Sequence, residues 1–153
     1  YSWVDVGSSY LMNDVSAAYL WGQLEQADEI NENRLRTWNL YYEGLKELKE
    51  KKLINLPSIP EKCTHNGHMF YIKLSDINER GLLIEHLKKS DMMAVFHYIP
   101  LHSSEAGNVF GIFNGNDIYT TIESERVLRL PIYYGISEKE VNTIINSVIG
   151  FYN

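Results

Sequence analysis

The sequence predicts an α+β domain in which a long helical entry precedes a small sheet with helices over one face. Three observations lead to this class. Apolar residues recur at spacings of three and four as far as about Lys51, short strand-like runs bounded by turn residues follow, and an amphipathic stripe ends the chain. A content of 44% hydrophobic residues in 153 is enough for one folded core.

The helical entry begins where Asn13 and Asp14 resemble an N-cap. The polar stretch 28–34 interrupts the apolar spacing, so we expect two consecutive helices or one kinked helix. Together they are long for a domain of this size, and long helices with wide apolar faces usually pack against something larger. The apolar positions that set the spacing are Ala17, Leu20, Trp21, Leu24, Ala27, Leu35, Trp38, Leu45 and Leu48.

About three strands are expected next. They are the run 53–56 before a proline, the alternating segment 69–74, and the run 93–96. Asn78 can cap a helix between the second and third of these strands. The glycine- and asparagine-rich stretch 107–116 predicts a loop.

The end of the chain is predicted to be helical in two pieces. A helix is expected from about Asp117 to Leu128, because Pro131 prevents further helix beyond it. Ser137 and Glu140 then form a capping box for a last helix. Its apolar stripe consists of Val141, Ile144, Ile145, Val148, Ile149 and Tyr152.

Composition excludes several classes of function. A net charge of −6 and a pI near 5.3 argue against a nucleic-acid partner, which requires a basic surface. No apolar run approaches the roughly 20 residues that span a bilayer, so no membrane partner is expected. Cys63 is the single cysteine, which is typical of a reducing cytoplasm.

The segment 97–102 carries the candidate ligand-binding residues. His97, Tyr98 and His102 surround a proline directly after a predicted strand, where ligand sites tend to gather. Two interpretations stay open, namely histidines that contact a ligand and structural histidines bonded to backbone carbonyls. The spacing of the histidines matches no zinc pattern, so no metal site is predicted. At the other end, the Gly7–Tyr10 segment precedes the first helix as either an anion site or a plain cap.

Five stretches of the sequence form a pattern when taken in order, namely Val6–Met12, Ala17–Leu20, Gln23–Glu25, His97–His102 and Ser124–Pro131. With this pattern the sequence resembles the C-terminal part of the DegT/DnrJ/StrS family of pyridoxal-phosphate-dependent aminotransferases, which act on nucleotide-linked keto sugars. Gly7–Leu11 and His68–Leu74 are most similar to the branch of dTDP-4-amino-4,6-dideoxygalactose transaminases. That branch makes TDP-fucosamine for enterobacterial common antigen and lipopolysaccharide.

The resemblance implies the aspartate-aminotransferase fold (fold type I) and its C-terminal small domain. Residues 1–52 would then link to a large domain outside the chain, and residues 53–153 would form the small α/β domain. The cofactor pyridoxal 5'-phosphate and its Schiff-base lysine would belong mainly to the large domain, so this chain alone would be inactive. The whole enzyme would be a cytoplasmic homodimer that uses glutamate and a TDP-4-keto-6-deoxyhexose.

The resemblance also assigns roles to single residues. Ser9 and Tyr10 would contact the cofactor phosphate of the neighbouring subunit, whereas Leu11 stands where relatives have an arginine. His97, Tyr98 and His102 would bind the sugar nucleotide, and none of them is assigned proton transfer. Two alternatives remain, namely a non-catalytic sugar-nucleotide binding module and a fragment of a sugar dehydratase in which histidine replaces the lysine.

Overall fold

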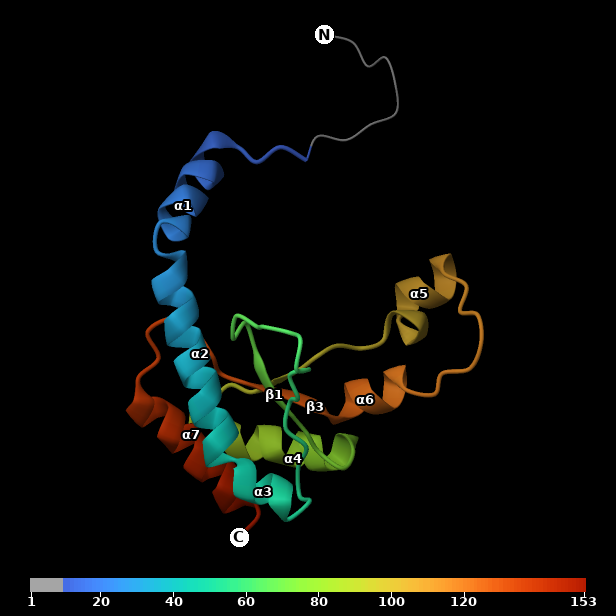
Figure 1. The fold of residues 1–153 in the computed structure, drawn as a ribbon. Coiled ribbons are helices and arrows are strands. Elements are labelled where there is room, and N and C mark those ends of the chain that lie inside the picture. The colour runs from blue at the N-terminus through green and yellow to red at the C-terminus, as the bar shows by residue number, and fades with distance from the viewer. Residues whose placement is uncertain (1–9) are drawn as a thin grey trace.

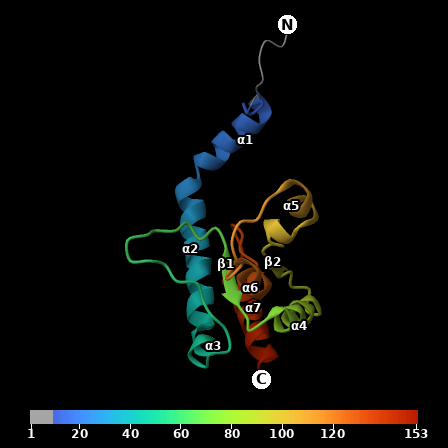
Figure 2. The same cartoon turned by 90° about the vertical axis from the view of Figure 1, so that its right-hand side faces the viewer.

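The structure, a computed structural model, describes residues 10–153, and Figures 1 and 2 show it in two orientations. Ser9 and the residues before it lie outside the described part. The elements in chain order are α1 (Asp14–Leu24), α2 (Ala27–Gly44), α3 (Lys46–Glu50), β1 (Phe70–Lys73), α4 (Ile77–Lys88), β2 (Val95–Phe96), the 3-10 helix η1 (Leu101–Ser103), α5 (Glu105–Phe110), α6 (Thr120–Arg126), β3 (Val127–Leu130) and α7 (Glu138–Phe151).

The sheet is antiparallel and has the order β1-β3-β2, so the last strand of the chain is the central one. Phe70 is opposite Leu130 across β1 and β3, and Phe96 of β2 is opposite Leu128. These side chains face the helices, and the alternate side chains form an open face. The helices α2, α4 and α7 contribute the buried residues that cover the helix-facing side of the sheet. The predicted α+β architecture with helices on one face is therefore confirmed.

An aromatic group lies at the centre of the core. Phe70 and Tyr41 are fully buried and stack with ring centroids 5.1 Å apart, and Trp38 meets Phe70 edge-on at 5.4 Å. The Tyr41 hydroxyl donates a hydrogen bond to the carbonyl oxygen of Pro131 at 2.8 Å. Burial raises the pKa of Tyr41 above its ordinary value, so this hydroxyl keeps its proton and remains a donor. The bond thus connects α2 to the segment that follows β3.

Two predicted helix caps are confirmed. The Asn13 side chain accepts a hydrogen bond from the Ser16 amide at 2.9 Å, and Ser137 and Glu140 form the expected capping box. The cap of α4 was misplaced by two residues. Asp76, not Asn78, accepts the amides of the first turn, because its carboxylate reaches two of them at once.

The strand prediction is wrong at two places. Residues 53–56 form no strand, since only Asn55 makes an isolated bridge, with Lys73. The predicted helix 117–128 is shorter, because α6 ends at Arg126 and the chain turns directly into β3. Leu128, which was expected to end that helix, and Leu130 therefore enter the core from a strand.

The loop predicted for 107–116 is also partly wrong. Its first residues belong to α5, which the Ser104 side chain caps by accepting the Gly107 amide at 3.0 Å. We call residues 101–119 the α5 arm. In Figure 1 the arm stands away from the sheet on the side opposite to α1.

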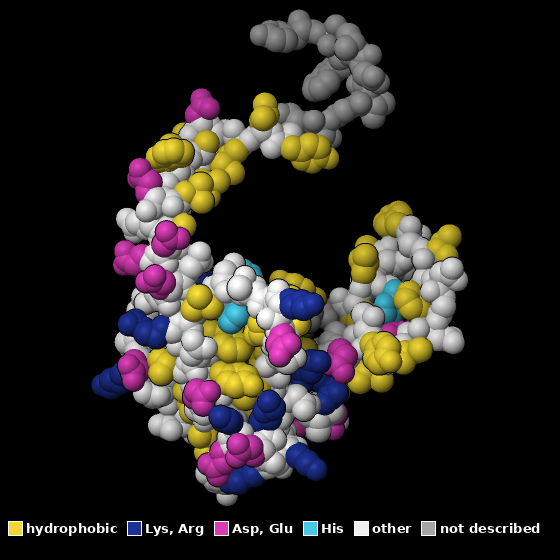
Figure 3. Space-filling view, in the orientation of Figure 1, with side chains coloured by type: hydrophobic (Ala, Val, Ile, Leu, Met, Phe, Trp, Pro, Cys, Tyr) yellow, Lys and Arg dark blue, Asp and Glu magenta, His cyan; other side chains and the backbone are white. Residues whose placement is uncertain are grey.

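The helical entry breaks at Glu25 and Gln26 rather than in the polar stretch 28–34, through which α2 runs without interruption. The helix α1 projects from the body, and none of its residues is buried. Figure 3 shows apolar side chains along α1 and around α5. Across residues 10–153, the helices lack the combination of length and apolar character that crossing a membrane requires.

Candidate functional site

The predicted site residues fall into three places. Ser9 lies outside the described residues, and Tyr10, next to it, is almost fully exposed ahead of α1. His97 and Tyr98 directly follow β2, with ring centroids 4.4 Å apart. His102 belongs to η1, at the start of the α5 arm. The structure thus brings His97 and Tyr98 together and places His102 in a second group.

His102 is held inside the α5 arm by an aspartate that sequence reasoning did not single out. Its Nε2 lies 3.0 Å from a carboxylate oxygen of Asp117, and its ring stacks on Phe113 with centroids 4.4 Å apart. A pocket of about 340 Å³ opens beside this group. The pocket is lined by Leu101, His102, Gly107, Gly111, Ile112, Phe113 and Thr120.

Asp117 also fixes the first turn of α6. Its carboxylate accepts the Thr120 amide at 2.9 Å, the Thr121 amide at 3.2 Å and the Thr121 hydroxyl. The Thr121 hydroxyl, followed by the backbone amides and His102, holds the pKa of Asp117 below its usual range. A lowered pKa in the folded state means that the ionised carboxylate stabilises the arm above the ordinary aspartate pKa. This contribution is lost as the pH falls through the lowered value.

Acidification, or Asp117→Asn, is therefore expected to loosen the start of α6. We expect amide hydrogen exchange of Thr120 and Thr121 to become several-fold faster in the variant at neutral pH. In the wild type, the exchange rates of the same two amides, corrected for the intrinsic pH dependence of exchange, should rise only in acid. The amides of α2, which has no side-chain cap, provide the internal control. Equal protection of the α6 amides in both proteins at neutral pH would contradict this role of Asp117.

The group of His97 and Tyr98 lies on the open face of the sheet and includes Arg129, which the sequence prediction missed. The Arg129 guanidinium carbon is 5.6 Å from the centroid of the Tyr98 ring. Arg129 lies in the middle strand, opposite Tyr71 on one side and Val95 on the other. The alternation of Leu128, Arg129 and Leu130 is the signal that could have revealed a strand here.

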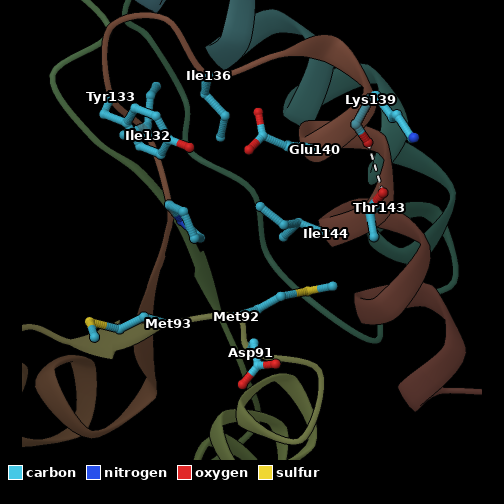
Figure 4. A pocket seen from close by; sticks show the side chains of 11 residues that line it. Asp91, Met92, Met93, Ile132, Tyr133, Ile136, Lys139, Glu140, Thr143 and Ile144 are labelled. Atoms are coloured by element: carbon cyan, nitrogen blue, oxygen red, sulfur yellow. Dashed lines mark hydrogen bonds between the residues drawn. The ribbon is translucent and has the colours of Figure 1, made fainter.

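A second pocket, larger than the one beside His102, lies elsewhere and contains none of the predicted site residues. It has a volume of about 690 Å³ and lies between α7 and the segments that enter β2 and leave β3 (Figure 4). Its wall is mainly apolar, and the Thr143 hydroxyl at its edge is satisfied by the Lys139 carbonyl at 2.8 Å. It is lined by Asp91, Met92, Met93, Pro131, Ile132, Tyr133, Ile136, Lys139, Glu140, Thr143 and Ile144.

The described residues offer little for metal or thiol chemistry. Within 10–153, His, Cys, Asp and Glu side chains form no group of three that could hold a metal ion. Cys63 is exposed in the loop before β1.

Comparison with known proteins identifies relatives over nearly the whole chain. The sequence model of the DegT/DnrJ/EryC1/StrS aminotransferase family matches residues 1–149. The uncharacterized protein MJ1066 of Methanocaldococcus jannaschii is 29% identical over 97% of this chain and 39% of its own length.

Solved structures share the fold. PseC of Helicobacter pylori, an aminotransferase involved in the biosynthesis of pseudoaminic acid, matches 97% of this chain with a TM-score of 0.81 and 18% identity. NtdA of Bacillus subtilis, solved with the bound cofactor PMP, matches 80% with a TM-score of 0.66 and 22% identity. The chain covers 40% of the former and 28% of the latter. It therefore spans well under half the length of these proteins.

The family match over 149 residues and the shared fold agree with each other. They confirm the predicted fold class, the α+β small domain of the aspartate-aminotransferase type. The chain belongs to the DegT/DnrJ/EryC1/StrS aminotransferase family.

Proposed function

We propose that this chain is the C-terminal part of a pyridoxal-phosphate-dependent aminotransferase that moves an amino group from glutamate to a TDP-4-keto-6-deoxyhexose. The product would serve the synthesis of lipopolysaccharide or enterobacterial common antigen, as in the dTDP-4-amino-4,6-dideoxygalactose transaminase branch. The family match across residues 1–149 is the observation that carries the proposal. The substrate and the pathway rest on the sequence resemblance of the segments 7–11 and 68–74.

The lysines of the chain support placing the Schiff-base lysine elsewhere in the protein. A Schiff-base lysine is activated by a desolvated or strongly charged pocket. None of the nine lysines is buried, and Lys73, the least exposed, is paired with Glu123 at 2.5 Å. Residues 1–52 would connect to a large domain that holds the cofactor, and residues 53–153 would form the small domain. The isolated chain would then be inactive, and the whole protein would work as a cytoplasmic homodimer.

In this proposal the chain recognises substrate and cofactor without transferring protons. The cofactor, when bound, supplies the delocalisation of charge that the amino transfer requires. Ser9 and Tyr10 would donate hydrogen bonds to the cofactor phosphate of the neighbouring subunit. Tyr10 is 94% exposed, so its hydroxyl is accessible for such a bond. His97, Tyr98 and His102 would hold the sugar nucleotide in position.

The site assignment can be tested with the double variant Ser9→Ala, His97→Ala in the full-length protein. Loss of one hydrogen bond to a charged group costs about 1.5–3 kcal/mol, so we expect kcat/KM to fall at least roughly a hundredfold. The measurement is the rate at which 2-oxoglutarate forms from glutamate in the presence of the TDP-keto sugar. The control is Ser58→Ala, His68→Ala, because both of its residues are exposed. Retained activity in the first variant would refute the assignment.

The same assay separates the two alternative functions. A sugar dehydratase would consume the sugar nucleotide without forming stoichiometric 2-oxoglutarate from glutamate. A binding module would bind TDP and convert neither compound. Stoichiometric 2-oxoglutarate and amino sugar would support the transaminase.

A further inference from the structure

Arg129 occupies the centre of the only sheet face that no helix covers within the described residues. It belongs to the middle strand, and its neighbours across the sheet are an aromatic residue, Tyr71, and an aliphatic one, Val95. Neither neighbour can neutralise a guanidinium group. A cation placed between uncharged strand neighbours gains nothing from cross-strand pairing.

The other cations around the sheet all have oxygen partners. Lys73 is paired with Glu123, Arg80 donates to the Ser124 carbonyl at 2.7 Å, and Arg126 donates to the Leu74 carbonyl at 2.7 Å. Arg129 forms neither a hydrogen bond nor an ion pair with residues 10–153. Its Nε atom is nevertheless shielded from solvent. The Nε atom of Arg80 is shielded and without a partner as well, but the Arg80 guanidinium still donates through Nη1. Arg129 therefore differs from Arg80 and Arg126 in that its guanidinium has no oxygen partner at all among residues 10–153.

The residues next to Arg129 include a second unsatisfied atom. The Nδ1 atom of His97 is likewise shielded and has no partner among the described residues. The Tyr98 ring contacts both side chains, at 4.4 Å from the His97 ring and 5.6 Å from the guanidinium carbon, and is itself 64% exposed. The three side chains thus form a cluster with a guanidinium group, an imidazole and an open aromatic ring.

We propose that Arg129 binds an oxyanion of the substrates, with His97 and Tyr98 forming the remainder of the subsite. A guanidinium group presents paired donors that match a phosphate or a carboxylate in bidentate geometry. Contact with the Tyr98 ring restricts the side chain and leaves its donors for a ligand. This inference rests on the proposed function, whose substrates carry such groups in two places. They are the diphosphate of the sugar nucleotide and the carboxylates of glutamate.

The test uses the full-length protein saturated with its cofactor. Two quantities are measured, namely the dissociation constant of TDP by calorimetry and the KM for glutamate in the transaminase assay. Removal of the charged fork in Arg129→Gln should weaken one of them about 10- to 150-fold, the equivalent of 1.5–3 kcal/mol. Arg129→Lys should restore only part of the loss, because a lysine cannot form the fork. Arg36→Gln, on the exposed side of α2, is the matched control and should change neither quantity more than twofold.

The two arms identify the source of the anion. Weaker TDP binding assigns Arg129 to the diphosphate, and a raised KM for glutamate assigns it to the amino donor. If both quantities are unchanged in Arg129→Gln, or if Arg129→Lys behaves as wild type in both, the proposal is overturned. If the wild-type protein binds TDP in a way that depends on Arg129 but has no transaminase activity, the proposed function is refuted and the Arg129 subsite stands. The thermal unfolding midpoint of each variant shows whether a loss of binding or activity reflects misfolding. If Arg129→Gln is misfolded, the comparison of Arg129→Lys with the wild type tests the proposal instead.

Discussion

Phe70→Ala is expected to destabilise the domain by about 3–5 kcal/mol, a large part of the stability of an ordinary domain. Phe70 is fully buried in β1 and contacts the rings of Tyr41 and Trp38. Its removal would leave a cavity between the sheet and α2, which the stacked rings cannot fill without moving. The free energy of unfolding, measured by urea titration of the purified chain, tests this expectation.

Phe110→Ala is the matched control for this experiment. Phe110 ends α5 and is 88% exposed, so its truncation should change the free energy of unfolding by no more than about 0.5 kcal/mol. A similar cost at both positions would mean that the sheet and α2 do not share the core described here.

Self-association of the 153-residue chain is the second large effect that we expect. The helix α1 carries Val15, Tyr19, Leu20, Trp21 and Leu24, all exposed. These residues lie on more than one side of the helix, and a helix that is apolar on all sides is normally buried. A contiguous exposed apolar surface of this kind promotes association. We therefore expect oligomers in light scattering at micromolar concentration.

Trp21→Ser should weaken this association. Burial of one large apolar side chain contributes about 1.5–3 kcal/mol, which corresponds to a roughly 10- to 150-fold change in the dissociation constant. Leu82→Ser is the control, because Leu82 lies on α4 and is exposed to a similar extent, 60% against 67% for Trp21. A monodisperse wild-type monomer, or equal effects of the two substitutions, would show that α1 does not mediate association.

Features that depend on neighbouring residues in the chain could be predicted from the sequence. The capping box of Ser137 and Glu140 and the Asn13 cap involve residues three apart, so their spacing alone identifies them. The amphipathic stripe of α7 is equally local. Its residues Val141 and Val148 are fully buried, as the periodicity indicated.

Features that depend on residues far apart in the chain could not be predicted from the sequence. The residues of β3 follow a helix without a turn signal, and only pairing with β1 and β2 makes them a strand. Residues 53–56 have strand-like composition, but only Asn55 finds a partner, so composition alone misled the prediction.

The candidate site divides in the same way. The segment 97–102 was recognisable because its polar rings follow an apolar run. The residues that contact these rings could not be recognised. Asp117 is 15 positions away from His102, and Arg129, which contacts Tyr98, lies on another strand. Each partner depends on an element whose boundaries the sequence did not reveal.

The strand order has a consequence for synthesis of the protein. The central strand is the last of the three to be made, so β1 and β2 have no partner in the sheet until residues 127–130 have left the ribosome. During that interval Phe70 and Ile72 are exposed on a nascent strand with free backbone donors and acceptors. The sheet must therefore form late and from distant contacts, which is a slow route. A chain that stops before Val127 would lack the strand that joins the other two.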